Sequence, residues 1–199
     1  MADGNKRSRL GAAGIIVLGL FAGLGSGWFA ISQRSSGQTY SGWSGSSVTG
    51  SVDADPWTRA RVAVTGLLAL NKSQAIYFGR KSDDGGKPFR ADCRYRVSGG
   101  QLPGSWWSVT VYAADNFLPL NDDDALSFDA TEVKTDEQGH WSATLAPMRP
   151  SDGSAWASTR NGGNFDITLR IYQPSVQAQA DFSSIPMPKV SLIDCGGAA

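Results

Sequence analysis

The residues best suited to acid–base or metal chemistry are His140 and the acidic cluster Asn121–Asp124. His140 is the single imidazole of the chain, and it lies in Asp136-Glu-Gln-Gly-His-Trp, which is typical of a hairpin turn that enters a strand. Catalysis by a serine triad needs a nucleophile, a base and an orienting carboxylate, and no G-x-S-x-G elbow surrounds any serine. The acidic cluster lacks the calcium-loop pattern. We therefore expect no catalytic residue, no metal and no cofactor, and a hydrolase using His140 and Asp122–Asp124 is the least favoured alternative.

Aromatic residues crowd into the segment around residue 107. Strand alternation places Trp107, Val109 and Val111 on one face, which we expect to be the core, and Trp106 and Tyr112 on the other. If the second face is covered, Trp106 and Tyr112 are packing residues. If it is open, they form an aromatic platform for a sugar ring or a partner protein. The sequence leaves both interpretations open.

An uncharged run near the N-terminus predicts a membrane helix over residues 10–32. Leu10–Ile31 holds 22 residues without a charge, and as a helix it spans about 33 Å, against about 30 Å for a bilayer core. A cleavable signal peptide is the alternative, but its apolar region is usually shorter. Residues 1–9 form a basic head with three basic side chains, whereas only Arg34 follows the run. The positive-inside rule then predicts a cytoplasmic N-terminus in a bacterial inner membrane and a periplasmic body.

Three glycines, Gly19, Gly23 and Gly27, recur every four residues along one face of this helix. Such spacing lets a second helix approach closely, although glycine is common in membrane helices for other reasons. We favour packing against an integral-membrane partner.

The two cysteines, Cys93 and Cys195, both lie in the part predicted to be exported, where disulfides persist. A bond between them would close a loop of about 100 residues. Two unrelated buried thiols are the alternative.

Residues 33–52 are dominated by Ser and Gly, and residues 35–52 carry no charge, which predicts a flexible linker. Tyr40 and Trp43 are unusual in such a segment. They are either incidental aromatics in a tether or contacts to headgroups, the body or a partner.

The rest of the chain, 53–199, is predicted to be one periplasmic domain. Asp55-Pro56 is typical of a helix start, and apolar residues from Trp57 to Leu68 follow at helical spacing, with Asn71 as a stop. Period-two alternation then predicts strands over Ala75–Phe78, Cys93–Val97, Trp107–Tyr112, Trp141–Leu145 and Phe165–Tyr172. The expected fold is mainly β: an antiparallel, jelly-roll-like sandwich with one N-terminal amphipathic helix, preceded by a single transmembrane helix.

Several segments of this domain resemble a known family in their order along the chain. They are Asp55-Pro-Trp-Thr-Arg-Ala, Leu67-Leu-Ala-Leu-Asn, Ala75-Ile-Tyr-Phe, Cys93-Arg-Tyr-Arg-Val-Ser-Gly-Gly, Trp106-Trp-Ser-Val-Thr-Val-Tyr and Leu169-Arg-Ile-Tyr. Residues 53–195 are thereby similar to the bacterial domain-of-unknown-function family 1214. The resemblance implies a mainly β, jelly-roll-like domain and no agreed activity. In many relatives a domain of family 1254 precedes it, and here an anchor and a linker stand in its place.

The charge balance excludes one class of partner. The chain has 199 residues with 18 Lys+Arg and 18 Asp+Glu, and a formal net charge of zero argues against nucleic-acid binding. The leading hypothesis is an accessory or structural subunit of a larger membrane protein complex, in contact with the lipid bilayer and integral-membrane partners. The alternative is a periplasmic binding module for a carbohydrate or another small ligand.

Overall fold

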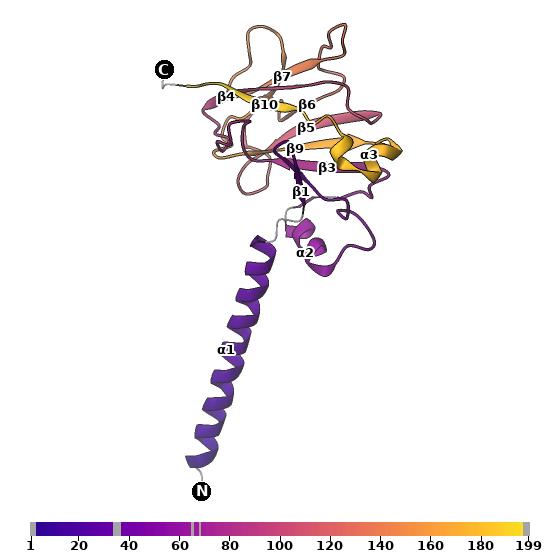
Figure 1. Ribbon diagram of the computed structural model, residues 1–199. Helices are drawn as coiled ribbons and strands as arrows, with labels where there is room; N and C mark the ends of the chain where they lie inside the picture. Colours follow the sequence, from indigo (N-terminus) through magenta and orange to yellow (C-terminus); the bar gives the residue numbers. More distant parts are fainter. Residues whose placement is uncertain (1–2, 34–36, 65, 68, 197–199) are drawn as a thin grey trace.

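A long N-terminal helix and a β body make up the computed structural model (Figure 1), which describes residues 3–33, 37–64, 66, 67 and 69–196. Helix α1 runs over Asp3–Gln33, and its stretch Gly11–Phe29 has a mean hydropathy of 1.8. By length and composition this stretch can cross a membrane. Its residues are exposed apart from the half-buried Gly27. The predicted apolar helix is therefore present, while Arg34 lies outside the described residues.

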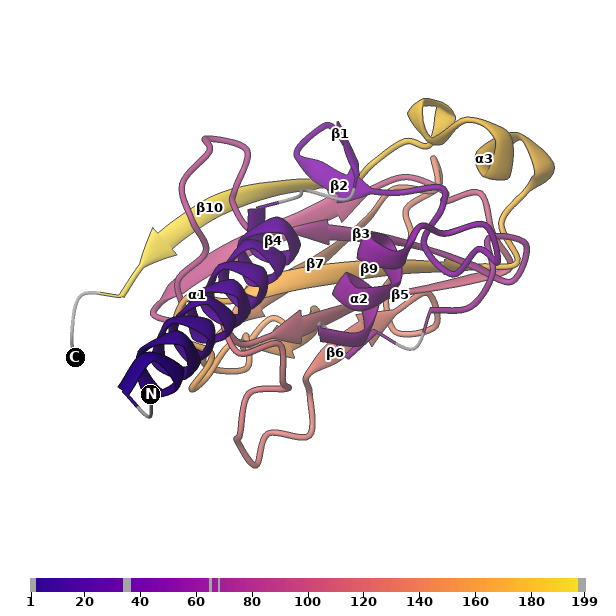
Figure 2. The same cartoon turned by 90° about the horizontal axis from the view of Figure 1, so that it is seen from below.

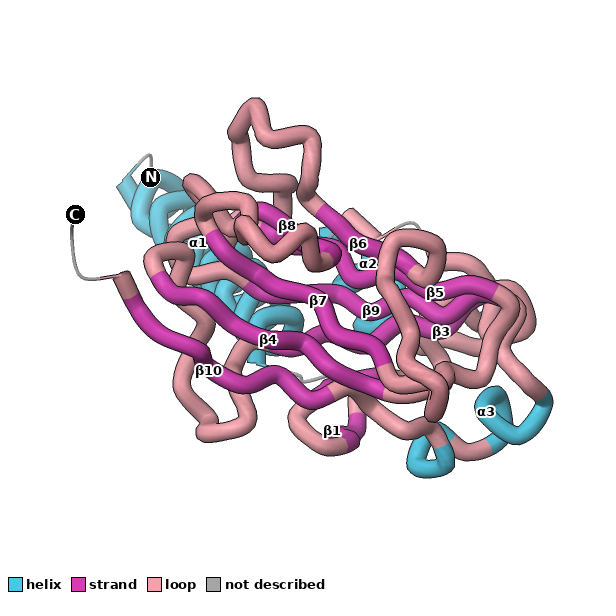
Figure 3. The backbone as a smooth tube through the Cα atoms, turned by 90° about the horizontal axis from the view of Figure 1, so that it is seen from above, coloured by secondary structure: helices cyan, strands magenta, loops and turns pink. Residues whose placement is uncertain are grey.

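Two sheets form the body (Figure 3). One sheet has the order β1 (Gln38–Tyr40), β2 (Trp43–Gly45), β3 (Ala75–Arg80), β9 (Asp166–Tyr172), β5 (Trp106–Tyr112) and β6 (Ser127–Asp129). The other has the order β10 (Lys189–Cys195), β4 (Cys93–Gly99), β7 (Trp141–Ala146) and β8 (Ala155–Ser158). All five predicted strands are present. The pairing departs from the expected antiparallel pattern at β7 and β8, which run parallel.

The core lies between the two sheets and is built from the inward positions of alternating strands. On β9, Ile167, Leu169 and Ile171 are fully buried, as the alternation predicts. Trp107 of β5 stacks on Trp141 of β7 with ring centroids 4.4 Å apart, which joins the two layers. The fold is therefore mainly β, with two packed sheets.

The segment predicted as a flexible linker is instead partly structured, because Gln38–Gly45 form a hairpin that extends the six-stranded sheet. Ser41 (φ 48°) and Gly42 (φ 84°) both have positive φ, which suits the tight two-residue turn of a hairpin. Trp43 is completely buried, and its Nε1–H donates to the Pro188 carbonyl at 2.7 Å. The favourable free energy of burying this indole exceeds the conformational entropy that the Ser/Gly-rich segment loses when it becomes ordered.

Helix α2 (Pro56–Val64) begins where the sequence predicts, because Asp55 Oδ1 accepts the backbone N–H groups of Trp57 and Thr58. It ends well before the predicted stop at Asn71, close to Gly66, whose φ of 67° is incompatible with a continuing helix. Trp57 is also exposed rather than part of a buried face. Leu68 lies outside the described residues.

A disulfide closes the C-terminal end of the body. β10 pairs with β4 along the edge of the four-stranded sheet, and Cys93 and Cys195 are bonded across this pair. The short helix α3 (Val176–Ala180) and the 3-10 turn η1 (Phe182–Ser184) connect β9 to β10.

Candidate functional site: a groove over the six-stranded sheet

The outer face of the six-stranded sheet has a row of small residues across its middle. Ser44, Gly79, Thr168 and Thr110 lie side by side in register on β2, β3, β9 and β5. A Cβ atom added at Gly79 would meet nothing within 4 Å. Because no bulky side chain stands in this row, the middle of the face forms the floor of an open trough.

The segment containing α2 covers this trough and converts it into a groove. Figure 2 shows α2 lying over β3, β9 and β5. The groove has a volume of about 900 Å³, which is in the range of small-molecule sites. Val62, Leu67 and Leu70 give it an apolar wall. This wall is tied to the floor, because the Leu70 backbone N–H donates to the Tyr77 hydroxyl at 3.0 Å.

A cation, Arg170, lies on the floor of the groove. Its Nη1 donates to Thr110 Oγ1 at 2.9 Å and its Nη2 to the Tyr112 hydroxyl at 2.5 Å. The guanidinium carbon is 5.5 Å from the centroid of the Tyr112 ring. Neutral hydroxyl groups therefore hold a half-buried guanidinium in place, and no carboxylate among the described residues lies within ion-pair distance of it.

A carboxyl group, Asp166, lies on the same face four residues away from Arg170, directly opposite Tyr112 in the strand register. Burial raises the pKa of Asp166 above its ordinary value, and the positive charge of Lys81 partly offsets this. Four residues of strand separate the two backbone positions by about 13 Å. The Arg170 guanidinium reaches along the strand to Thr110 and Tyr112, and Tyr112 is the register partner of Asp166. The groove floor therefore has a guanidinium near its middle and a partly desolvated carboxyl at the Tyr112 end.

The aromatic residues predicted to share one surface are separated in the structure. Trp106 packs against Tyr172 with ring centroids 5.1 Å apart, at the opposite end of β5 from Tyr112. Of the four aromatic residues singled out from the sequence (Tyr40, Trp43, Trp106 and Tyr112), Tyr112 lines the groove. Trp43 cannot belong to an exposed interaction surface because it is fully buried, and the half-buried Tyr40 packs edge-on against Phe78 and Phe182. Trp106 and Tyr112, the two residues of the possible aromatic platform, thus lie at opposite ends of β5.

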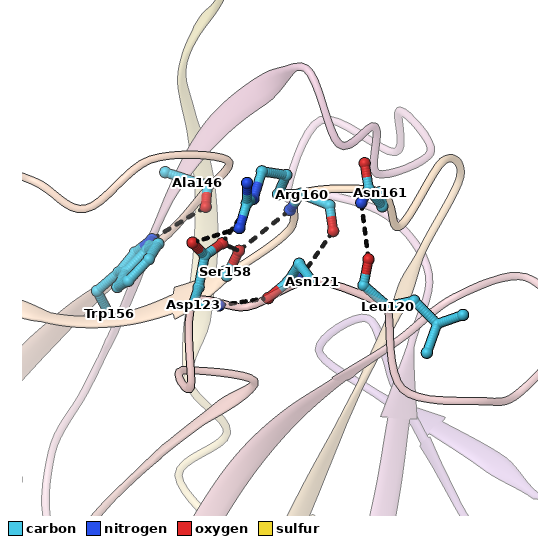
Figure 4. Close-up of polar contacts among 8 residues, drawn as sticks. All are labelled: Leu120, Asn121, Asp123, Ala146, Trp156, Ser158, Arg160 and Asn161. Atoms are coloured by element: carbon cyan, nitrogen blue, oxygen red, sulfur yellow. Dashed lines mark hydrogen bonds and ion pairs between the residues drawn. The ribbon is translucent and has the colours of Figure 1, made fainter.

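The acidic cluster acts as an anchor for its own loop (Figure 4). Asp123 accepts hydrogen bonds from Ser158 Oγ at 2.6 Å and from Arg160 Nη2 at 2.7 Å. These donors lower the pKa of Asp123, the Ser158 hydroxyl most of all. The side-chain amide of Asn121 donates to the Arg160 carbonyl at 2.9 Å. The cluster thus attaches the loop to the end of β8, and across the described parts of the chain no group of three metal-ligating side chains comes together.

His140 lies in the turn that the sequence predicts. Its side chain is exposed, with Nδ1 3.4 Å from Asp136 Oδ2, and its backbone N–H donates to Asp136 Oδ1. Asp136 thereby organises the turn in which His140 lies.

The family of proteins described as "Protein of unknown function (DUF1214)" matches residues 74–176, just over half of the chain. The chain belongs to this family. The match is narrower than the expected 53–195 and covers β3 through β9, so it includes most of the groove floor. The α2 segment that forms the apolar wall lies outside it.

A solved structure shares the fold of this DUF1214 chain. The VPA0106 protein from Vibrio parahaemolyticus is similar to it with a TM-score of 0.57 and 22% identity, over 71% of this chain and 36% of that one. An uncharacterized protein from Burkholderia cenocepacia has a TM-score of 0.40 and 16% identity, over 63% of this chain and 31% of that one. The DUF1214 chain thus spans about a third of each of these proteins. No curated protein matches it.

Sequence reasoning did not select Gly79, Asp166 or Arg170 as site residues. A signal was present for two of them, because the alternation of Phe165–Tyr172 places Asp166 and Arg170 on the face away from the core. What the sequence does not give is the register between strands far apart in the chain. That register brings Gly79 beside Thr168 and Thr110 beside Arg170.

Proposed function

We propose that this DUF1214 protein is a single-pass, membrane-anchored accessory subunit of a larger membrane protein complex, with its N-terminus in the cytoplasm and its β body in the periplasm. The observation that carries the proposal is the exposure of α1. Large apolar side chains such as Ile15, Phe21 and Leu24 are each more than 70% exposed. Burial of such a surface in a bilayer is strongly favourable.

The glycine face of α1 supports a protein partner within the membrane. Cβ atoms added at Gly19, Gly23 and Gly27 would meet nothing within 4 Å, so no other part of the described chain occupies this face. Helix association in lipid depends on close packing, which small residues permit. The Cys93–Cys195 disulfide supports an oxidising compartment for the body.

The test is extraction from native membranes in a mild detergent, with a tag at Ala199, and mass spectrometry of the proteins that co-purify. We expect a stoichiometric set of integral-membrane proteins. A protein that runs as a lone monomer under these conditions would overturn the proposal.

A matched pair of substitutions tests the glycine face itself. Gly23→Leu fills it, whereas Gly25→Leu makes the same chemical change about 200° around the helix. Both variants keep an apolar helix and should insert equally. We expect Gly23→Leu to lose the partners and Gly25→Leu to retain them, and equal retention by both would show that this face is not the contact.

A further inference from the structure

We propose that the groove over the six-stranded sheet binds a small molecule that carries a carboxylate or phosphate oxyanion on an apolar body, and that Arg170 binds the oxyanion. This inference is independent of α1, because it rests on the β body alone.

The charge of Arg170 is the first step of the argument. Four of the eight other arginines of the body, Arg80, Arg90, Arg94 and Arg160, each pair with an aspartate. Among the described residues, Arg170 has only the hydroxyl groups of Thr110 and Tyr112 as hydrogen-bond partners. A half-buried cation without a counter-charge is unfavourable, and an anionic ligand would relieve this. The planar guanidinium is suited to two-pronged binding of carboxylate or phosphate oxygens.

The orientation of Arg170 is the second step. Two hydrogen bonds and the Tyr112 ring fix the guanidinium before any ligand arrives. Preorganisation lowers the entropic cost of binding. Thr168, between Arg170 and Asp166 on β9, adds a hydroxyl group to the groove floor.

The asymmetry of the groove supplies the third step. Its floor is polar, whereas its wall holds Val62, Leu67 and Leu70. A ligand that matches both surfaces has a polar head and an apolar body. Asp166 would repel an anion, but among the described residues it forms no ion pair with Arg170, and it is close enough to Lys81 for that charge to lower its pKa. The oxyanion is therefore assigned to the Arg170 guanidinium.

The test uses the full chain in phosphatidylcholine nanodiscs, with empty nanodiscs as the blank. Octanoate and octyl phosphate are titrated by calorimetry, and octanamide serves as the uncharged counterpart. We expect both anions to bind and octanamide to bind at least about tenfold more weakly. Equal binding of octanoate and octanamide, or no binding of either anion, would overturn the proposal.

Two substitutions locate the site by different means. Arg170→Gln removes the charge, and Gly79→Val fills the floor at a position where the added side chain meets open space. Each should weaken octanoate binding at least about tenfold. Arg96→Gln is the matched control, since Arg96 is an exposed arginine on β4 of the other sheet. Unchanged binding in both groove variants, with folding verified by circular dichroism, would contradict the assignment.

A final arm distinguishes a lipid from a soluble ligand. The octanoate titration is repeated with the full chain in nanodiscs that contain phosphatidylglycerol. If an anionic lipid headgroup is the occupant, octanoate binding falls; if a free carboxylate or phosphate is, binding stays the same. In either case Arg170→Gln must weaken octanoate binding at least about tenfold in phosphatidylcholine nanodiscs. Octanoate binding that is as tight in this variant as in the natural protein would overturn the proposal.

Discussion

Asp123 and Arg170 are charged side chains that both interact with hydroxyl groups, but only Asp123 has its counter-charge. The Asp123 carboxylate receives hydrogen bonds from Ser158 and Arg160, so its charge is balanced within the fold. The partners of Arg170 are neutral. The first arrangement stabilises a loop, and the second leaves a charge available to a ligand.

The charge of Asp123 predicts a pH-dependent stability. Its folded-state pKa is lowered, so it stabilises the fold above its unfolded pKa of about 3.9, and this contribution is lost as the pH falls through the folded-state pKa. We expect Asp123→Asn to have a lower Tm than the natural protein at pH 7, with the difference closing below about pH 4. Thermal unfolding followed by circular dichroism between pH 2 and pH 7 measures this.

Asp122→Asn is the control for Asp123→Asn. Asp122 is an exposed neighbour in the same loop, and its substitution should leave Tm unchanged over the whole pH range. A Tm difference for Asp123→Asn that persists at pH 2 would assign the effect to packing rather than to charge.

Among the elements, the β1–β2 hairpin depends most on a single side chain. β1 and β2 have three residues each, so their backbone pairing alone is weak. Trp43 fixes the hairpin by full burial and by its hydrogen bond to Pro188, 145 residues away in the chain. The hairpin is therefore held by tertiary packing.

We expect Trp43→Ala to lower the free energy of unfolding by about 3–5 kcal/mol, because it removes a fully buried indole and leaves a cavity. Trp57→Ala is the matched control: Trp57 is 42% exposed on α2, and its loss should change stability by no more than about 0.5 kcal/mol. Urea unfolding of both variants measures the difference. Equal losses for the two tryptophans would contradict the burial of Trp43.

The sequence predicted the central strands because their alternation matches a core on one side. β9 is the clearest example, with Ile167, Leu169 and Ile171 inward. The sequence did not predict the β1–β2 hairpin. The high Ser and Gly content of residues 33–52 indicated a flexible linker, and the two aromatic residues Tyr40 and Trp43 did not change that interpretation. The length of α2 was also overestimated, since helical spacing continues past Gly66, where the backbone turns. Packing between distant segments formed the hairpin, and a local turn at Gly66 ended α2, and the spacing of apolar residues reports neither.

At the scale of the molecule, both the groove and the four-stranded sheet include segments that lie outside the family match. Residues 74–176 contain both β3 and β9, which form most of the groove floor. The apolar wall comes from the segment before them, and β10 with Cys195 comes from the segment after them. The groove and the closed edge of the four-stranded sheet are therefore properties of the whole chain.

The disulfide provides the last prediction at this scale. β10 is an edge strand with a register irregularity between Leu192 and Asp194, and Leu192 and Ile193 are substantially exposed. Little apolar burial therefore holds the C-terminal half of β10. The Arg94–Asp194 ion pair also contacts this half, but an exposed ion pair contributes little stability. The two cysteines are 102 residues apart in the sequence. Removing a cross-link that closes a loop of this size lowers the free energy of unfolding by about 4–5 kcal/mol on the chain-entropy model.

We expect the double variant Cys93→Ala/Cys195→Ala to lose about this much stability in urea unfolding, and the reduced natural protein to match it. Hydrogen exchange at Leu169 in the core of β9 should rise only by this loss of global stability, whereas exchange in β10 near Leu192 should rise further through local opening of the edge strand. Equal loss of protection in β9 and β10 would mean that the disulfide acts on global unfolding alone. A larger loss in β10 would mean that it also clamps one edge strand, as the low burial of β10 leads us to expect.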